Sequence, residues 1–246
     1  MHRVTIEYWR DTGEDMSHPT APRATPDAPA HPQPQRTHHP RLRGWIHLGT
    51  TPLALAAGIV LVALAPSPAA RMATAAYAVT AVLLFAVSAA YHLGRWSPVP
   101  NATLRRLDHA NIFLIIAGTY TPFLALALPE PLNLWMLLTV WGAALLGVGF
   151  TCCWPGAPRW LSTSLYLALG WIAVLFAREL IVGTTPTIWI LVLVGGVLYS
   201  LGAITYALRW PDPHPGWFGF HEVFHALTVA AFVCQYVAVS FLVYNP

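Results

Sequence analysis

The charged residues of this chain are too few and too unevenly placed for a protein that folds in water. From residue 44 to residue 246 the sequence carries seven Arg, no Lys and five acidic residues. Charged residues make up 9% of the whole chain, whereas a soluble domain usually has ~25%. A chain of this composition cannot cover its surface with polar groups. A soluble globular protein is therefore excluded, and lipid is the expected solvent.

The apolar residues fall into seven stretches, each close to the ~20 residues that a bilayer-crossing helix needs. The predicted spans are 45–65, 72–94, 109–128, 133–153, 158–177, 187–208 and 219–243. Connections with proline or glycine turn signals separate them, and we expect Glu130, Glu179 and Asp212 to lie in these loops. The sequence predicts an all-α membrane protein with seven transmembrane helices in a single domain, 44–246.

The arginines predict the orientation of these spans, because cytoplasmic loops carry an excess of positive charge. Seven arginines fall on the side of the N-terminus: Arg41, Arg43, Arg95, Arg105, Arg106, Arg159 and Arg209. Only Arg71 and Arg178 fall on the other side. We therefore expect a multi-pass protein of the cytoplasmic membrane with its N-terminus in the cytoplasm and its C-terminus outside.

The first 43 residues differ in composition from the rest. They hold six Arg, five acidic residues and seven Pro without apolar periodicity, which predicts a disordered, Pro/His-rich cytoplasmic tail. Met16 is a second possible translation start, and the sequence does not decide between it and Met1. The net charge of +3 is too small and too scattered to indicate nucleic-acid binding.

Four ionisable residues lie at span depth, where charged groups usually face a cavity or a partner: His92, Asp108, His221 and His225. The spacing of His221 and His225 places both imidazoles on one face of a helix, as a zinc ion requires. The predicted topology brings His92 and Asp108 to the same cytoplasmic depth. This agreement favours a metal site with His92 as the third ligand.

Other interpretations of the neighbouring residues are open. His109 could be a ligand instead of His92, or it could orient Asp108, whereas His47 is interpreted as an interfacial residue. His221 to His225 also matches the HExxH motif of zinc proteases. No acidic residue follows His225, and this counts strongly against a metalloprotease.

Three stretches of the sequence resemble the bacterial hemolysin III family: Ser88–His92, Leu107–Phe123 and Gly219–His225. That family is related to the progestin and adiponectin receptors and, more remotely, to the alkaline ceramidases. The resemblance covers the chain from about residue 44 to its end, and the stretch Asp108–Phe123 is its most specific part. Asn111 stands where the family pattern leads us to expect a small residue.

The resemblance implies a seven-helix membrane protein that holds Zn²⁺ with His92, His221 and His225. Ser88 and Asp108 would lie close to the metal. The ceramidase relationship implies hydrolysis of a lipid amide or ester at the inner leaflet, with Asp108 as general base and Ser88 steadying it or the developing oxyanion. Two alternatives are a pore-forming or membrane-perturbing cytolysin and a receptor or scaffold with a structural zinc. Membrane lipid is the expected partner, while the sequence leaves the substrate, turnover and oligomeric state open.

Overall fold

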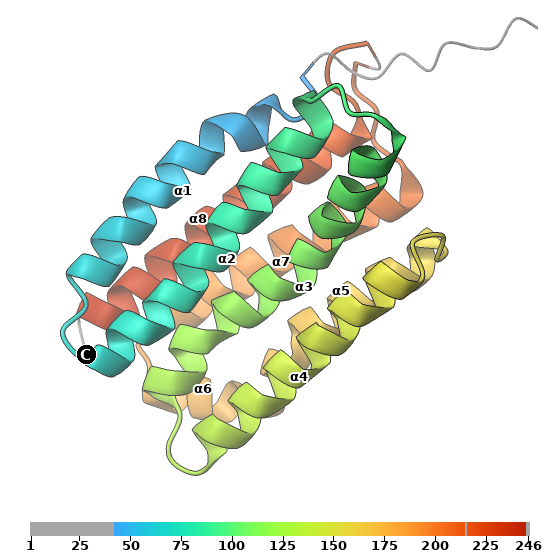
Figure 1. The fold of residues 1–246 in the computed structure, drawn as a ribbon. Coiled ribbons are helices and arrows are strands. Elements are labelled where there is room, and N and C mark those ends of the chain that lie inside the picture. Colours follow the sequence, from blue (N-terminus) through green and yellow to red (C-terminus); the bar gives the residue numbers. More distant parts are fainter. Residues whose placement is uncertain (1–41, 215, 245–246) are drawn as a thin grey trace, which may run out of the picture. The chain divides into compact units, whose positions relative to one another are not determined.

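The computed structural model describes residues 42–214 and 216–244, and its regular elements are all helical (Figure 1). They are α1 (Trp45–Ala63), α2 (Pro68–Leu93), α3 (Pro98–Ala127), α4 (Leu132–Cys153), α5 (Arg159–Gly170), the 3₁₀ helix η1 (Trp171–Phe176), α6 (Ala177–Gly183), α7 (Pro186–Leu208) and α8 (Phe220–Tyr244). Within the described residues, seven segments are long and apolar enough to cross a membrane, since α5, η1 and α6 together form the fifth. The predicted fold class is confirmed. The predicted tail lies outside the described residues except for Leu42 and Arg43.

Two predicted boundaries were wrong because charged residues interrupt the apolar pattern without ending the helix. The third helix begins at Pro98 rather than at 109. Proline suits the first turn of a helix, and the charged turns that follow extend the helix beyond its apolar part. The fifth segment continues to Gly183, so Arg178 and Glu179 lie in α6 and not in a loop.

The side chain of Tyr120 in α3 explains why the fifth segment can change from α to 3₁₀ geometry inside an apolar environment. Its hydroxyl donates to the carbonyl of Gly170 and accepts a hydrogen bond from the Ala173 N–H at 2.9 Å. These two backbone groups lie where α5 gives way to η1. In lipid such groups need partners within the protein, and Tyr120 supplies both.

Close contacts between neighbouring helices hold the interior together. Helix α2 packs against α1 and α3, α4 packs against α3, and α7 packs against α8 (Figure 1). Gly118 of α3 leaves no room for a Cβ beside Thr80 of α2. Asn111 of α3 donates a hydrogen bond to the carbonyl of Leu83 in α2 at 3.1 Å. Small residues and interhelical hydrogen bonds are the usual means of helix association in membranes, and they give Asn111 a structural role.

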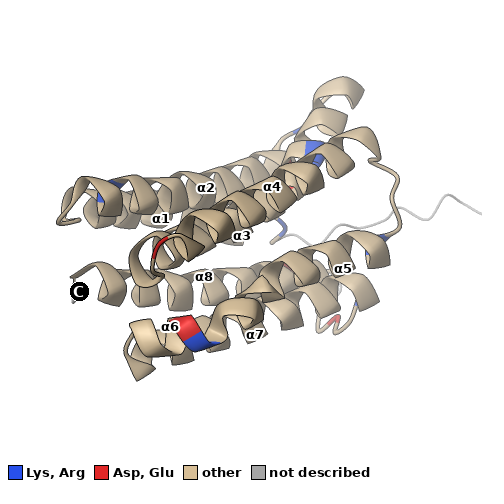
Figure 2. Cartoon of the chain, turned by 90° about the horizontal axis from the view of Figure 1, so that it is seen from below, with Lys and Arg blue, Asp and Glu red and all other residues tan. Residues whose placement is uncertain are grey.

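Charged side chains are scarce along the middle of the helices. In Figure 2, the ribbons are almost entirely tan between their ends, whereas Arg (blue) and Asp or Glu (red) lie mostly near the ends. The end of the bundle formed by the C-terminus of α2, the first turns of α3 and the start of α8 carries the polar residues that the sequence analysis singled out. The cytoplasmic orientation of this end stays a prediction.

We expect Tyr120→Phe to lower the thermal stability of the purified protein in detergent. The substitution leaves two buried backbone groups without their shared partner, at a cost of about 1–3 kcal/mol. Tyr244→Phe is the matched control, because the Tyr244 hydroxyl lies 3.5 Å from the Val60 carbonyl in an exposed position. Equal melting temperatures for the two variants would contradict this account of the fifth segment.

Candidate metal centre

Local structure at two helix ends positions the three histidines. His92 lies in the last turn of α2, which ends at Gly94 with a backbone hydrogen bond from Gly94 N–H to the Ala90 carbonyl. His221 and His225 lie in the first two turns of α8. Residues 129 positions apart in the sequence therefore meet at one end of the bundle.

Glu222 fixes the start of α8. Its Oε2 accepts a hydrogen bond from the Gly219 N–H at 2.8 Å, and the carbonyl of Gly219 accepts the first helical bond, from Val223. This is the arrangement of a capping box, in which the third helical residue reaches back to the N-cap. Glu222 is completely buried in this contact. The glutamate of the HExxH string thus shapes the helix end, and this geometry argues against a protease-like base.

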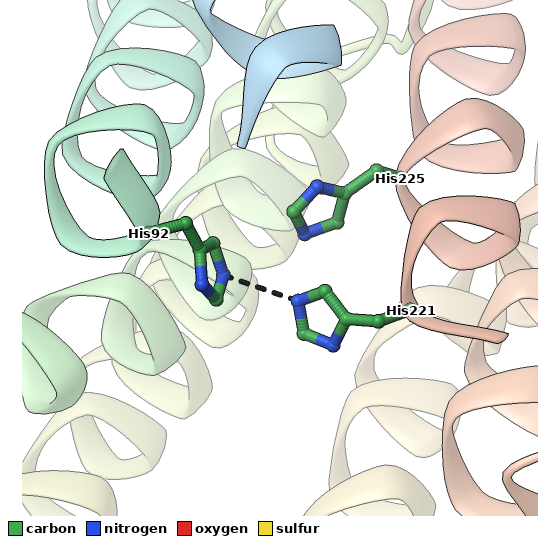
Figure 3. A group of neighbouring side chains, drawn as sticks. All are labelled: His92, His221 and His225. Atoms are coloured by element: carbon green, nitrogen blue, oxygen red, sulfur yellow. Dashed lines mark hydrogen bonds between the residues drawn. The ribbon is translucent and has the colours of Figure 1, made fainter. Parts of the chain in front are cut away.

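The three imidazoles face one another across the gap between α2 and α8 (Figure 3). One ring nitrogen from each of His92, His221 and His225 lies within 4.8 Å of the others. The Nε2 atoms of His92 and His221 are 3.1 Å apart. His221 and His225 are buried, and His92 is partly buried. Among the described residues, these three form the group that could hold a metal ion.

The donor set fits zinc. Zinc binds imidazole nitrogen at ~2.0–2.1 Å in tetrahedral geometry, which places two ligand nitrogens about 3.3 Å from each other. The 3.1 Å separation of His92 and His221 is close to this value, and the His225 nitrogen lies within 4.8 Å of both. Three neutral protein ligands leave the fourth position of a tetrahedral site open.

Asp108 and Ser88 lie beside this cluster, as the sequence analysis expected. Asp108 Oδ2 is 3.9 Å from His92 Nε2, and the Ser88 hydroxyl hydrogen-bonds to the Asp108 carboxyl group. Ser88 is buried on α2, one turn before His92. The carboxylate is therefore held at the edge of the cluster by a side chain from the same helix as His92.

His109 makes its hydrogen bonds with residues outside the three-histidine group. Its Nδ1 donates to the carbonyl of Arg105 at 2.7 Å, which leaves Nε2 as the acceptor for the Tyr206 hydroxyl at 3.2 Å. Both ring nitrogens are thus engaged. This geometry favours the alternative in which His109 orients Asp108 over the one in which it is a metal ligand, because His109 Nδ1 lies 3.9 Å from Asp108 Oδ2.

The interpretation of His47 as an interfacial residue was wrong. Its side chain is buried, with 2% of the residue exposed. The ring stacks on His225 with centroids 3.8 Å apart and an interplanar angle of 12°, and it meets the edge of Phe85 at 5.1 Å. Neither ring nitrogen has a hydrogen-bond partner among the described residues. A position two residues into an apolar span gave no sign that the side chain faces the bundle interior.

Sequence reasoning also missed Arg43 and Tyr206. Arg43 Nε donates to His92 Nδ1 at 3.3 Å, although its charge had been assigned to membrane orientation alone. Tyr206 lies on α7 between His109 and Arg159, whose guanidinium is 5.4 Å from the centre of the tyrosine ring. No local motif surrounds either residue, so only the packing of distant helices places them here.

The chain has seven apolar helical segments and one polar, histidine-rich end of the bundle. These features place it in the class of integral membrane proteins with a candidate metal site. The sequence model of the family described as "Haemolysin-III related" matches residues 35–236. The chain belongs to this family, and it is a multi-pass membrane protein.

Two curated relatives are similar in sequence. The "Hemolysin-3 homolog" of Bacillus subtilis (strain 168) is 32% identical over 138 residues, which are 56% of this chain and 62% of the relative. The "Hemolysin-3" of Bacillus cereus is 34% identical over 142 residues, which are 57% of this chain and 64% of the relative. The aligned part of the chain thus spans less than two thirds of either relative.

We expect His47→Phe to bind zinc nearly as well as the native chain, because a phenyl ring keeps the stack on His225 and loses no protein hydrogen bond. His47→Ala removes the stacked ring and should weaken zinc binding by about tenfold, the lower range for residues that support a metal ligand. Competition with a chromophoric chelator measures both affinities. Complete loss of zinc from His47→Phe would show that His47 is itself a ligand.

Proposed function

We propose that this chain is a zinc-dependent hydrolase of the cytoplasmic membrane that cleaves an amide or ester bond of a lipid at the inner leaflet. The observation that carries the proposal is the meeting of three histidines and one carboxylate at one end of an apolar bundle. Ionisable groups at such depth are costly and usually functional. A structural zinc is usually closed off by four protein ligands, whereas three histidines leave one position open for water.

His92, His221 and His225 would hold the zinc, which would supply Lewis-acid chemistry for the polarisation of a carbonyl and the activation of water. Asp108 would act as the general base. It takes a proton from the attacking water and returns it to the leaving amine or alcohol. Ser88 holds the carboxylate in position through its hydroxyl, and His109 Nδ1 lies 3.9 Å from Oδ2 of the same carboxylate.

The chemistry of the surroundings favours a lipid substrate. The cluster lies at the end of a bundle whose outer faces expose large apolar side chains, as expected of a surface in contact with acyl chains. A lipid head group at the membrane surface lies at the depth of the histidines when this end faces the cytoplasm. Lipid that diffuses in the inner leaflet can then reach the site without leaving the membrane.

We expect purified native protein to contain about one zinc per chain. His92→Ala, His221→Ala and His225→Ala should each lose it, because two remaining imidazoles hold the ion weakly. His214→Ala is the matched control, since His214 is exposed in the loop before α8. Metal content by inductively coupled plasma mass spectrometry decides this point. Retained zinc in all three ligand variants would overturn the assigned site.

Asp108→Asn should keep the zinc and lose hydrolysis by about 10²–10⁴-fold, the range that a general base contributes. The assay uses a fluorescent N-acyl lipid and a fluorescent O-acyl lipid in detergent micelles. Undiminished turnover by Asp108→Asn would remove Asp108 from the reaction. Zinc binding without turnover of either lipid by the native protein would favour a structural metal in a receptor or scaffold.

A cytolytic function is the second candidate, because two relatives carry the name hemolysin. Dye release from lipid vesicles distinguishes it. The hydrolase proposal expects no release by the native chain in vesicles of a non-hydrolysable ether lipid. Equal release by native protein and His92→Ala would instead support a membrane-perturbing activity that needs no metal.

A further inference from the structure

Arg43 lies on the short segment that leads into α1. It is the charged residue of this segment that contacts a candidate metal ligand. The Leu42 N–H donates to the carbonyl of Trp217 at 3.2 Å, so this segment is tied to the loop before α8. Gly44 has a φ of +85°, and a Cβ added there would lie 2.8 Å from the Cβ of His92. The segment 42–44 is therefore packed directly on His92, with Arg43 at its centre.

The hydrogen bond between Arg43 and His92 fixes which ring nitrogen lacks a proton. A guanidinium can only donate, so His92 Nδ1 accepts from Arg43 Nε at 3.3 Å. A neutral imidazole carries one proton, which then lies on Nε2. Nε2 is the nitrogen that faces His221 in Figure 3.

Coordination of a metal by His92 is incompatible with this hydrogen bond. Coordination through Nε2 moves the ring proton to Nδ1, where it would face the Arg43 N–H, and two donors cannot bond to each other. A metal-binding histidine normally gives this N–H to an acceptor such as a carboxylate or a carbonyl. Coordination through Nδ1 would displace Arg43 directly. With either nitrogen, Arg43 has to leave His92 when the metal binds.

Asp108 offers an alternative partner for the displaced side chain. Its carboxyl group already interacts electrostatically with Arg43 and lies 3.9 Å from His92 Nε2. His92 and Asp108, with which Arg43 interacts, thus both belong to the candidate site.

We propose that Arg43 competes with the metal for His92 and so sets the metal affinity of the site through the segment 42–44. This inference rests on the proposed zinc site and adds a residue that regulates it. Metal occupancy and the position of this segment are therefore linked.

Arg43→Met tests the proposal in the full-length protein in detergent. We expect the zinc dissociation constant to fall by about tenfold, because a hydrogen bond to a charged group no longer opposes coordination. Competition with a chromophoric chelator measures the constant. The visible spectrum of the cobalt-substituted protein should not change, since Arg43 is not a ligand.

Arg159→Met is the matched control, because it removes one positive charge at the same end of the bundle without touching a candidate ligand. Its zinc affinity should equal that of the native chain. Unchanged or weaker binding by Arg43→Met, or an equal gain in both variants, would overturn the competition. Absence of zinc from the native protein and from both variants would instead overturn the zinc site itself, and the inference with it.

Discussion

The absence of water from the interior of a bilayer governs this structure. Each backbone and side-chain polar group in the described spans must find its partner within the protein, or else lie at the membrane surface. Tyr120 meets this requirement for the fifth segment, where η1 interrupts the α-helical hydrogen bonds. Asn111 meets it between α2 and α3. The hydrogen bonds of Tyr120 and Asn111 lie at separate places along the bundle and do not form a cluster.

The histidine-rich end is different because its polar groups are concentrated and incompletely paired. His47 is buried with two unpartnered ring nitrogens, and Nδ1 of His225 also lacks a partner among the described residues. Unsatisfied buried groups are costly, so a cluster of them indicates a site that binds something. We propose a metal ion as its occupant, because one ring nitrogen from each of His92, His221 and His225 lies within 4.8 Å of the others.

The sequence predicted the fold class and the composition of this cluster because both depend on strong local signals. Span length and hydropathy are properties of one helix, and the His221–His225 spacing is a property of one helix face. The boundary at Pro98 was missed because a helix can extend beyond its apolar part. Arg178 and Glu179 were misplaced for a similar reason, since charged residues are tolerated in a helix near the membrane surface.

The residues that sequence reasoning missed all depend on contacts between helices far apart in the chain. His47 faces inward because α1 packs beside α8. Tyr206 reaches His109 across 97 positions of the sequence, and Arg43 meets His92 across 49. A single sequence holds no record of such pairs. The result is a candidate site whose three histidines could be predicted to lie together, whereas the groups around them could not.

X-ray absorption spectroscopy at the zinc edge of the purified native protein tests the central claim most directly. The account predicts three imidazole nitrogens and one further light atom at ~2.0–2.1 Å from the metal. A zinc bound by four protein ligands, by sulfur, or not at all would contradict it.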